Sequence, residues 1–219
     1  KKIRVVKKRK KIPIFVGGTG LYFKALTDGL VNIPDIPIQF RKKVRASHKN
    51  LGQKKFYQKL LKLDPKSKDK INPTDTQRSI RAYEVKQFTK KSIHDWFKNT
   101  KSYFDKVDFL KIYIDFPRAD LIQKISKRTD QMFKIGVIQE VKRFIKLKVR
   151  KDKSVNKAIG INEIKEHLKY KNDLREVMEK ISIKTRQYAK RQSTWARGNM
   201  MSWLKLPPQD LNKFLKKIK

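Results

Sequence analysis

The chain has 219 residues, enough for one sizeable domain or two small ones with a hydrophobic core. It contains no cysteine, which excludes disulfides, cysteine-bound metals and thiol chemistry. Its 58 Lys and Arg residues against 20 Asp and Glu give a net charge of +38, so nucleic acid is the expected partner. Lysine far outnumbers arginine, a composition that an AT-rich genome produces whatever the function, so clustered arginines are more informative than the total charge.

Several other classes of protein are disfavoured by what the sequence lacks. The three histidines, His48, His94 and His167, are scattered among charged residues without a metal-binding spacing, so no metal site is predicted. No apolar run approaches the roughly 20 residues that a membrane span needs. The basic N-terminus also lacks the apolar core of a signal peptide. We therefore expect a cytoplasmic chain that does not enter a membrane.

The first half of the chain is predicted to contain one strand followed by helices. The apolar run at 12–17 is typical of a buried strand, and a helix at 21–30 follows it. Two or three short, basic amphipathic helices are expected within 39–71. Asp75 is a favourable N-cap for a helix to about position 91, and Ser92 starts a further short helix.

The second half begins with an alternating apolar pattern at 107–116, which predicts a second core strand. Pro117 then opens a helix that Gly136 is expected to end. The remaining expected elements are helices at 138–148, 158–168, 174–197 and 207–218, and a small strand at 203–204.

This order of elements predicts an α/β core interrupted by a mostly helical insertion. Residues 1–37 form a partial core, 38–100 the insertion, and 101–219 the remainder of the core with C-terminal helices. Two strands do not make a self-sufficient sheet. We therefore expect part of the core to lie outside this sequence, whose first residue is lysine.

The stretch VGGTG at 16–20 has the glycine content of a phosphate-binding loop. It is not a Walker A motif, because no lysine follows the glycines at the required spacing. Gly17 and Gly18 would let the backbone approach a ligand closely, and Thr19 offers a hydroxyl at a helix N-terminus. A tight turn capped by threonine, with no ligand, explains the same residues.

A second candidate site is the helical stretch QRSIRAYEV. Gln77 and Arg81 lie one helical turn apart on the same face, with Arg78 beside them. Glutamine can hydrogen-bond the edge of a base while the arginines hold phosphates. A solvated helix face is the alternative.

The long helix near the C-terminus contains the sequence IKTRQYAKRQSTWARG. Basic residues interleaved with aromatics suit RNA, whose bases stack on rings while phosphates meet guanidinium groups. Tyr188 and Trp195, however, continue the heptad-like spacing of Val177 and Ile181, so both rings could equally belong to the core. The expected basic stripe consists of Arg186, Lys190, Ser193 and Arg197, with Arg191 beside it.

Taken in order, these segments resemble the tRNA dimethylallyltransferases, also called tRNA isopentenyltransferases. The resemblance extends from Lys11 to Arg197 and rests on PIFVGGTGLYFKAL, NPTDTQRSIRAYEV, the spacing from Arg128 to Val141, KAIGINE and TRQYAKRQSTWARG. It implies a P-loop-kinase-like α/β core with a helical insertion. It also implies transfer of a dimethylallyl group from dimethylallyl diphosphate to N6 of the adenosine just 3′ of the anticodon. The target base is flipped out of its stack, and Mg²⁺ assists the leaving diphosphate.

The resemblance also implies roles for individual residues. Thr19 would stand beside the target adenosine and Arg128 would pair with the diphosphate, as catalytic residues. Ile161 stands where the family usually has tyrosine, Lys157 where it can have arginine, and Ala196 where a larger apolar residue is usual. The residues implied to contact the tRNA anticodon stem-loop are Arg41, Gln77, Arg78, Ser79, Ile80, Arg81, Lys157, Ala158, Ile159, Gly160, Ile161, Asn162, Lys190, Arg191, Gln192, Ser193, Thr194, Trp195, Ala196 and Arg197.

One feature of the family is absent from these 219 residues. The family's P-loop, G-P-T-x-[SAG]-x-K-[ST], and the following strand that ends in a catalytic aspartate are not found. The expectation is therefore a core lacking its N-terminal strands, its P-loop and the P-loop ligand of Mg²⁺. Such a chain would contact tRNA but would not transfer the prenyl group alone, and a separately encoded N-terminal segment is a candidate partner. A non-enzymatic basic RNA-binding protein, or a decaying gene product, remains the alternative.

Overall fold

The computed structural model describes residues 2–104 and 109–217 and divides the chain into two compact units. Unit 1 consists of Lys1–Gly20 and Leu110–Lys219, and unit 2 consists of Leu21–Phe109. Unit 1 is discontinuous in sequence, because unit 2 lies between its two segments. Its division points differ from the sequence-based boundaries, because unit 2 already begins at Leu21 instead of residue 38.

The turn after α2 (Gly20–Thr27) shows why unit 2 is larger than the predicted insertion. Gly29 has φ +91°, and a Cβ at this position would stand 2.1 Å from the carbonyl oxygen of Lys101. This close approach needs glycine. It ties both ends of the insertion together, so the segment near residue 29 belongs with the helices that follow it.

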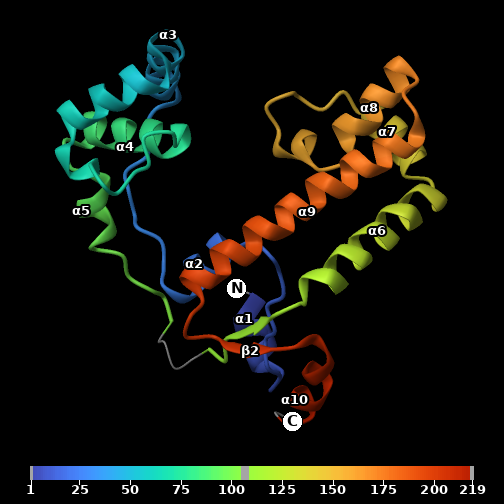
Figure 1. Ribbon diagram of the computed structural model, residues 1–219. Coiled ribbons are helices and arrows are strands. Elements are labelled where there is room, and N and C mark those ends of the chain that lie inside the picture. The colour runs from blue at the N-terminus through green and yellow to red at the C-terminus, as the bar shows by residue number, and fades with distance from the viewer. Residues whose placement is uncertain (1, 105–108, 218–219) are drawn as a thin grey trace. The chain divides into compact units, whose positions relative to one another are not determined.

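Unit 2 is helical, with α3 (Ile38–Leu63), η1 (Pro65–Ser67), α4 (Thr76–Thr89) and α5 (Ile93–Phe97) (Figure 1). The helix α3 is broken at Gly52, whose φ of 72° and ψ of 165° are not helical, in keeping with the several short helices expected here. The hydrophobic core of unit 2 comprises Val44, Phe56, Tyr57, Leu60, Ile71, Ala82, Tyr83, Val85 and Ile93.

Two predicted helix caps in unit 2 are confirmed. A carboxylate oxygen of Asp75 accepts the backbone N–H of Arg78 at 3.0 Å, which satisfies one free donor at the start of α4. The hydroxyl of Ser92 accepts the backbone N–H of His94 at 3.2 Å and donates to the buried carboxylate of Asp64 at 2.8 Å. These caps fix where α4 and α5 begin.

Unit 1 contains α6 (Arg118–Lys134), α7 (Val137–Lys146), α8 (Ile161–Tyr170) and α9 (Leu174–Asn199), and α6 runs alongside α9 in Figure 1. Gly136 follows α6 with φ 96°, the left-handed conformation expected of a residue that ends a helix. Buried hydroxyls join the two long helices, since Ser182 donates to Thr129 at 3.1 Å. The core of these helices comprises Val137, Val141, Ile164, Val177 and Ile181.

Shorter elements complete unit 1. They are α1 (Lys2–Lys8), η3 (Ser154–Lys157), η4 (Pro208–Asp210) and α10 (Leu211–Lys217). No helix in the described ranges is long and apolar enough to cross a membrane.

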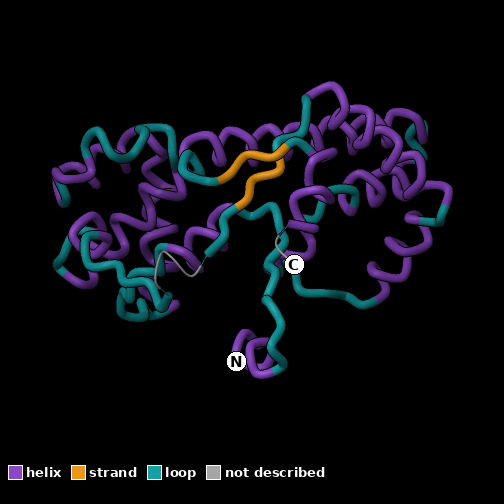
Figure 2. The backbone as a smooth tube through the Cα atoms, turned by 90° about the horizontal axis from the view of Figure 1, so that it is seen from below, coloured by secondary structure: helices purple, strands orange, loops and turns teal. Residues whose placement is uncertain are grey.

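A small parallel sheet lies in unit 1, formed by β1 (Ile112–Ile114) and β2 (Leu204–Leu206) (Figure 2). Ile112 pairs with Leu204, and Ile114 pairs with Leu206. The strand expected at 107–116 is thus present over three residues, while positions 107 and 108 lie outside the described residues. The strand expected at 203–204 forms at 204–206.

The prediction of a strand at 12–17 is wrong. The structure has a loop there, and the side chains of Ile14 and Val16 are 75% and 92% exposed. A strand is stabilised by hydrogen bonds to a neighbouring strand. Within the part of the chain that the structure describes, β1 and β2 pair only with each other, so this apolar run has no strand to join.

Candidate functional site

The glycine turn at 17–20 packs against the second half of α9 within unit 1. A Cβ on Gly18 would stand 2.4 Å from Nε2 of Gln192, and one on Gly20 would stand 2.0 Å from the indole of Trp195. Both glycines therefore allow a close approach of loop and helix. The exposed Thr19 lies between these two contacts, so the structure brings it to the predicted segment 190–197.

The second half of α9 presents only part of that segment to solvent. Lys190, Arg191, Thr194 and Arg197 are exposed, whereas Ala196 is 5% exposed and faces inward. A helix turns by 3.6 residues, so a contiguous run cannot all lie on one surface. Ala196 thus packs in the interior, and the neighbouring side chains form the accessible surface.

The heptad-like pattern in α9 divides into two parts. Val177 and Ile181 are buried, as their spacing predicts. Tyr188 is 42% exposed, and the guanidinium of Arg191 lies 5.8 Å from the centre of its ring. Trp195 is half-buried against Gly20. Of the two aromatics, Tyr188 is the one that offers a free ring surface.

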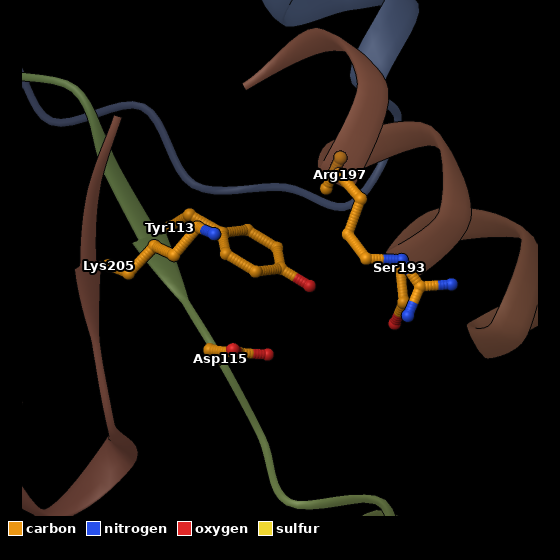
Figure 3. Close-up of a pocket in the computed structure, with 6 residues that line it drawn as sticks. Tyr113, Asp115, Ser193, Arg197 and Lys205 are labelled. Atoms are coloured by element: carbon orange, nitrogen blue, oxygen red, sulfur yellow. The ribbon is translucent and has the colours of Figure 1, made fainter. Parts of the chain in front are cut away.

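A pocket of about 120 Å³ lies between the two strands and α9. In Figure 3 the ring of Tyr113 projects from β1 toward α9, where Ser193 and Arg197 stand. Asp115 follows directly after the carboxyl end of β1, the position where parallel sheets commonly bind ligands. The residues that line the pocket are Tyr113, Asp115, Ser193, Ala196, Arg197 and Lys205.

Sequence reasoning marked only the α9 residues of this pocket. Tyr113 and Lys205 lie on the two strands and Asp115 directly follows β1; none of the three was expected to contribute. The pocket combines a carboxylate, a phenol, a guanidinium and an ammonium, so it can hydrogen-bond a polar or anionic ligand. The one local signal for Asp115 was its place at the end of an apolar run.

The predicted segment KAIGIN at 157–162 is held onto α9 by a buried carboxylate. Glu163 accepts the backbone N–H of Gly160 at 2.8 Å, and Lys184 of α9 donates to its other oxygen. Gly160 has φ +101° and is buried, so its part is to shape the turn. Four residues of this segment are exposed and Ile161 is half-buried; the exposed ones are Lys157, Ala158, Ile159 and Asn162.

Opposing effects act on the ionisation of this pair. Burial by itself would raise the pKa of Glu163, but the hydrogen bonds from Lys184 and from backbone N–H groups outweigh it and lower the pKa. The hydrogen bond and charge of Glu163 correspondingly raise the pKa of Lys184. Both groups are therefore charged at neutral pH, and the pair fixes the position of the segment.

In unit 2, the predicted stretch 77–81 is divided between surface and interior. Gln77 and Arg78 are exposed at the first turn of α4. Ser79 is buried and donates its hydroxyl to the carbonyl of Asp75 at 2.7 Å, and Ile80 packs against the core. The helical period again explains the division, since Ser79 faces the interior and Ile80 is half-buried against the core.

Two arginines predicted to contact tRNA share a partner in unit 2. Arg41 of α3 and Arg81 of α4 both form ion pairs with Glu84, each at 3.6 Å. Their side chains are 43% and 41% exposed. Arg41 and Arg81, far apart in sequence, thus lie on one surface of unit 2.

The remaining predicted residue, Arg128, lies on the surface of α6 and does not line the pocket. It has no ion-pair partner among residues 2–104 and 109–217. Those same ranges contain no group of three or more His, Cys, Asp or Glu residues that could hold a metal ion. Mg²⁺ is therefore assigned to none of the described residues and stays an implication of the sequence resemblance.

Comparison with known proteins identifies the family. The model of the IPP transferase family matches residues 1–199. The tRNA dimethylallyltransferase of Pelagibacter ubique is 59% identical over all 219 residues, which span 70% of that protein. The tRNA dimethylallyltransferase of Rickettsia massiliae is 39% identical over the whole chain, which spans 60% of its length.

Solved structures agree with this result. A eukaryotic dimethylallyltransferase acting on tRNA matches 99% of this chain with a TM-score of 0.77 and 25% identity, over 57% of its own chain. The tRNA delta(2)-isopentenylpyrophosphate transferase of Staphylococcus epidermidis matches 99% with a TM-score of 0.57 and 29% identity, over 72% of its own chain. The expected similarity to the tRNA isopentenyltransferase fold is confirmed. The chain is mostly helical and contains a small parallel sheet. The chain belongs to the IPP transferase family.

Proposed function

We propose that this chain acts in tRNA modification, in the transfer of a dimethylallyl group from dimethylallyl diphosphate to N6 of the adenosine just 3′ of the anticodon. The observation that supports this most directly is the packing of the glycine turn against α9. It puts Thr19, the residue implied to stand beside the target base, at the half of α9 that also carries the exposed cations Lys190, Arg191 and Arg197. A tRNA phosphate backbone bound along this half of α9 would bring its bases to the same part of unit 1 as Thr19.

Arg128 is the proposed partner of the diphosphate. Its guanidinium is exposed and has no carboxylate partner in the described part of the chain, so its donors are available to an anion. Bidentate hydrogen bonds from arginine stabilise the charge that develops on a leaving diphosphate. We expect Arg128→Gln to weaken binding of inorganic diphosphate. Lys127→Gln, which removes the same charge from the neighbouring exposed position, is the matched control.

The 219-residue chain is proposed to bind tRNA without transferring the prenyl group by itself. Its sequence contains no P-loop motif to hold the diphosphate. The test is to incubate the chain with unmodified tRNA, dimethylallyl diphosphate and Mg²⁺, and to analyse the digested nucleosides by mass spectrometry. Prenylated adenosine would contradict the proposed inactivity, whereas failure to bind tRNA at all would contradict the proposed role.

A generic basic RNA-binding protein is the second candidate function. It is favoured by the net charge of +38, which attracts any polyanion. Such binding depends on salt and not on the identity of a base. The two candidates therefore differ in whether tRNA affinity depends on the adenosine 3′ of the anticodon.

A further inference from the structure

A buried acid in unit 2 lies among three arginines. The carboxylate of Glu84, on α4, belongs to a side chain only 2% exposed. Arg41 Nε lies 3.6 Å from its Oε2, Arg45 Nε lies 3.9 Å from its Oε1, and Arg81 Nη1 lies 3.6 Å from its Oε2. None of these arginines pairs with another acid within the described ranges, so one negative charge is shared by three positive charges.

The hydrogen bonding of this cluster is incomplete. All three distances exceed the length of a good N–H···O bond. Within the described residues, Arg41 Nε and Glu84 Oε1 are buried and have no hydrogen-bond partner. Each guanidinium carries five N–H donors, and the three arginine side chains remain 41% to 59% exposed. The cluster therefore has positive charge and donors available to an anion from solvent.

We propose that Arg41, Arg45 and Arg81 form a binding site for a phosphodiester of an RNA backbone, and that Glu84 is the positioning residue that orients their guanidinium groups. The inference rests on the proposed tRNA-binding function and adds Arg45, which lies outside the sequence motifs, and Glu84, which lies within one but had no role assigned to it. The single carboxylate of Glu84 neutralises only one of the three guanidinium groups, so two positive charges remain. The exposed Gln77 and Arg78 on the same helix extend this surface toward a polynucleotide, which favours a backbone phosphate over a free anion.

Replacing Glu84 distinguishes a positioning role from simple electrostatics, because the two predict opposite changes in tRNA affinity. Glu84→Gln raises the net charge of the chain by one, so charge alone predicts equal or tighter tRNA binding. Loss of positioning predicts binding about three- to tenfold weaker, since the guanidinium groups are no longer aligned. Asp69→Asn is the matched control, because Asp69 is exposed in the same unit, has no ion-pair partner in the described residues and changes the charge equally.

The measurement is fluorescence anisotropy with unmodified tRNA and the full 219-residue chain, with circular dichroism to verify the fold. Asp69→Asn is expected to bind at least as tightly as the parent chain. Glu84→Gln that binds as tightly as Asp69→Asn would overturn the positioning role.

Arg45 tests the site from an exposed position, although its replacement removes one of the three ion pairs of Glu84. Its side chain is 59% exposed, so Arg45→Gln should leave the fold intact. We expect tRNA affinity to fall about three- to tenfold, and the slope of log affinity against log salt to decrease by about one. Lys42→Gln, at an exposed position of the same helix, is the control for loss of one charge. Equal affinities and slopes for the two variants would overturn the site.

A last experiment keeps this inference separate from the tRNA-binding proposal. The Nε–Hε signals of Arg41, Arg45 and Arg81 are followed by NMR in the full chain while inorganic phosphate is added. Shifts of these three signals that disappear in Glu84→Gln would support the site even if tRNA did not bind. Unchanged signals would overturn it, whatever the outcome with tRNA.

Discussion

The indole of Trp195 lies directly against Gly20, so close that a Cβ on the glycine would stand 2.0 Å from a ring carbon. This contact joins the glycine turn to α9 through a residue without a side chain and one with the largest side chain. Gly20 has no left-handed φ, so sterics alone explain the need for glycine here. The position of Thr19 beside α9 depends on this contact.

We therefore predict that Gly20→Ala destabilises unit 1. The added methyl group has to displace the Trp195 ring, at a cost of about 1 to 3 kcal/mol in the free energy of unfolding. Urea denaturation, followed by tryptophan fluorescence, measures this change. The same variant should weaken tRNA binding, because Thr19 and α9 no longer hold their relative positions.

Gly198→Ala, on the helix α9 that carries Trp195, provides the control. A Cβ at Gly198 would meet no atom within 4 Å, and alanine favours a helix. The control should be neutral or more stable by up to about 1 kcal/mol. If Gly20→Ala were as stable as Gly198→Ala, the contact with Trp195 would not have the importance assigned to it.

The ion pair between Glu163 and Lys184 predicts a pH dependence of stability. The pKa of Glu163 is lower in the folded chain than in the unfolded chain, so its contribution is complete above the unfolded value of about 4.3. That contribution is lost as the pH falls through the folded pKa. We expect Glu163→Gln to lower the free energy of unfolding at pH 7 by about 1 kcal/mol, a modest value because solvent screens the half-exposed Lys184.

Urea denaturation between pH 7 and pH 3 checks this prediction. The difference between the parent chain and Glu163→Gln should shrink as the pH falls below about 4.3. Glu140→Gln, at an exposed position in the first turn of α7, should show only the contribution of the helix dipole, roughly 0.3 kcal/mol. A Glu163→Gln difference that stays constant down to pH 3 would show that the charge of Glu163 does not stabilise the fold.

The cap at Asp75 leads to a third prediction. Asp75→Ala removes the acceptor for the Arg78 N–H and should cost about 1 kcal/mol of stability. Asp75→Ser retains a capping oxygen and should restore most of the loss, although it also removes the ion pair to the Arg78 guanidinium at 2.8 Å. Thermal denaturation distinguishes the two variants. Equal melting temperatures would mean that the cap contributes little.

Features that depend on local chemistry could be predicted from the sequence. Asp75, Ser92 and Gly136 act through their own backbone neighbours, so their roles as caps and helix end follow from residue type and position. The helical periodicity of Val177 and Ile181 likewise predicts their burial. Each of these predictions needs only a few residues of context.

Features that depend on distant contacts could not be predicted in this way. The run at 12–17 has the composition of a strand, but a strand also needs a partner, and none is present in the described residues. The cluster around Glu84 joins arginines from α3 and α4, and Asp115 and Arg197 line one pocket only because of the fold. Contiguous motifs also overstate a helical surface, as the buried Ser79 and Ala196 show.

The most direct test of the tRNA-modification role is the affinity of the chain for two tRNAs that differ only in the base 3′ of the anticodon. Fluorescence anisotropy would compare adenosine with guanosine at that position, for the parent chain and for Gln77→Ala. We predict about tenfold tighter binding of the adenosine tRNA, and weaker binding of it by Gln77→Ala. Equal affinity for both tRNAs, unchanged by Gln77→Ala, would contradict this role and indicate a basic protein that binds any RNA.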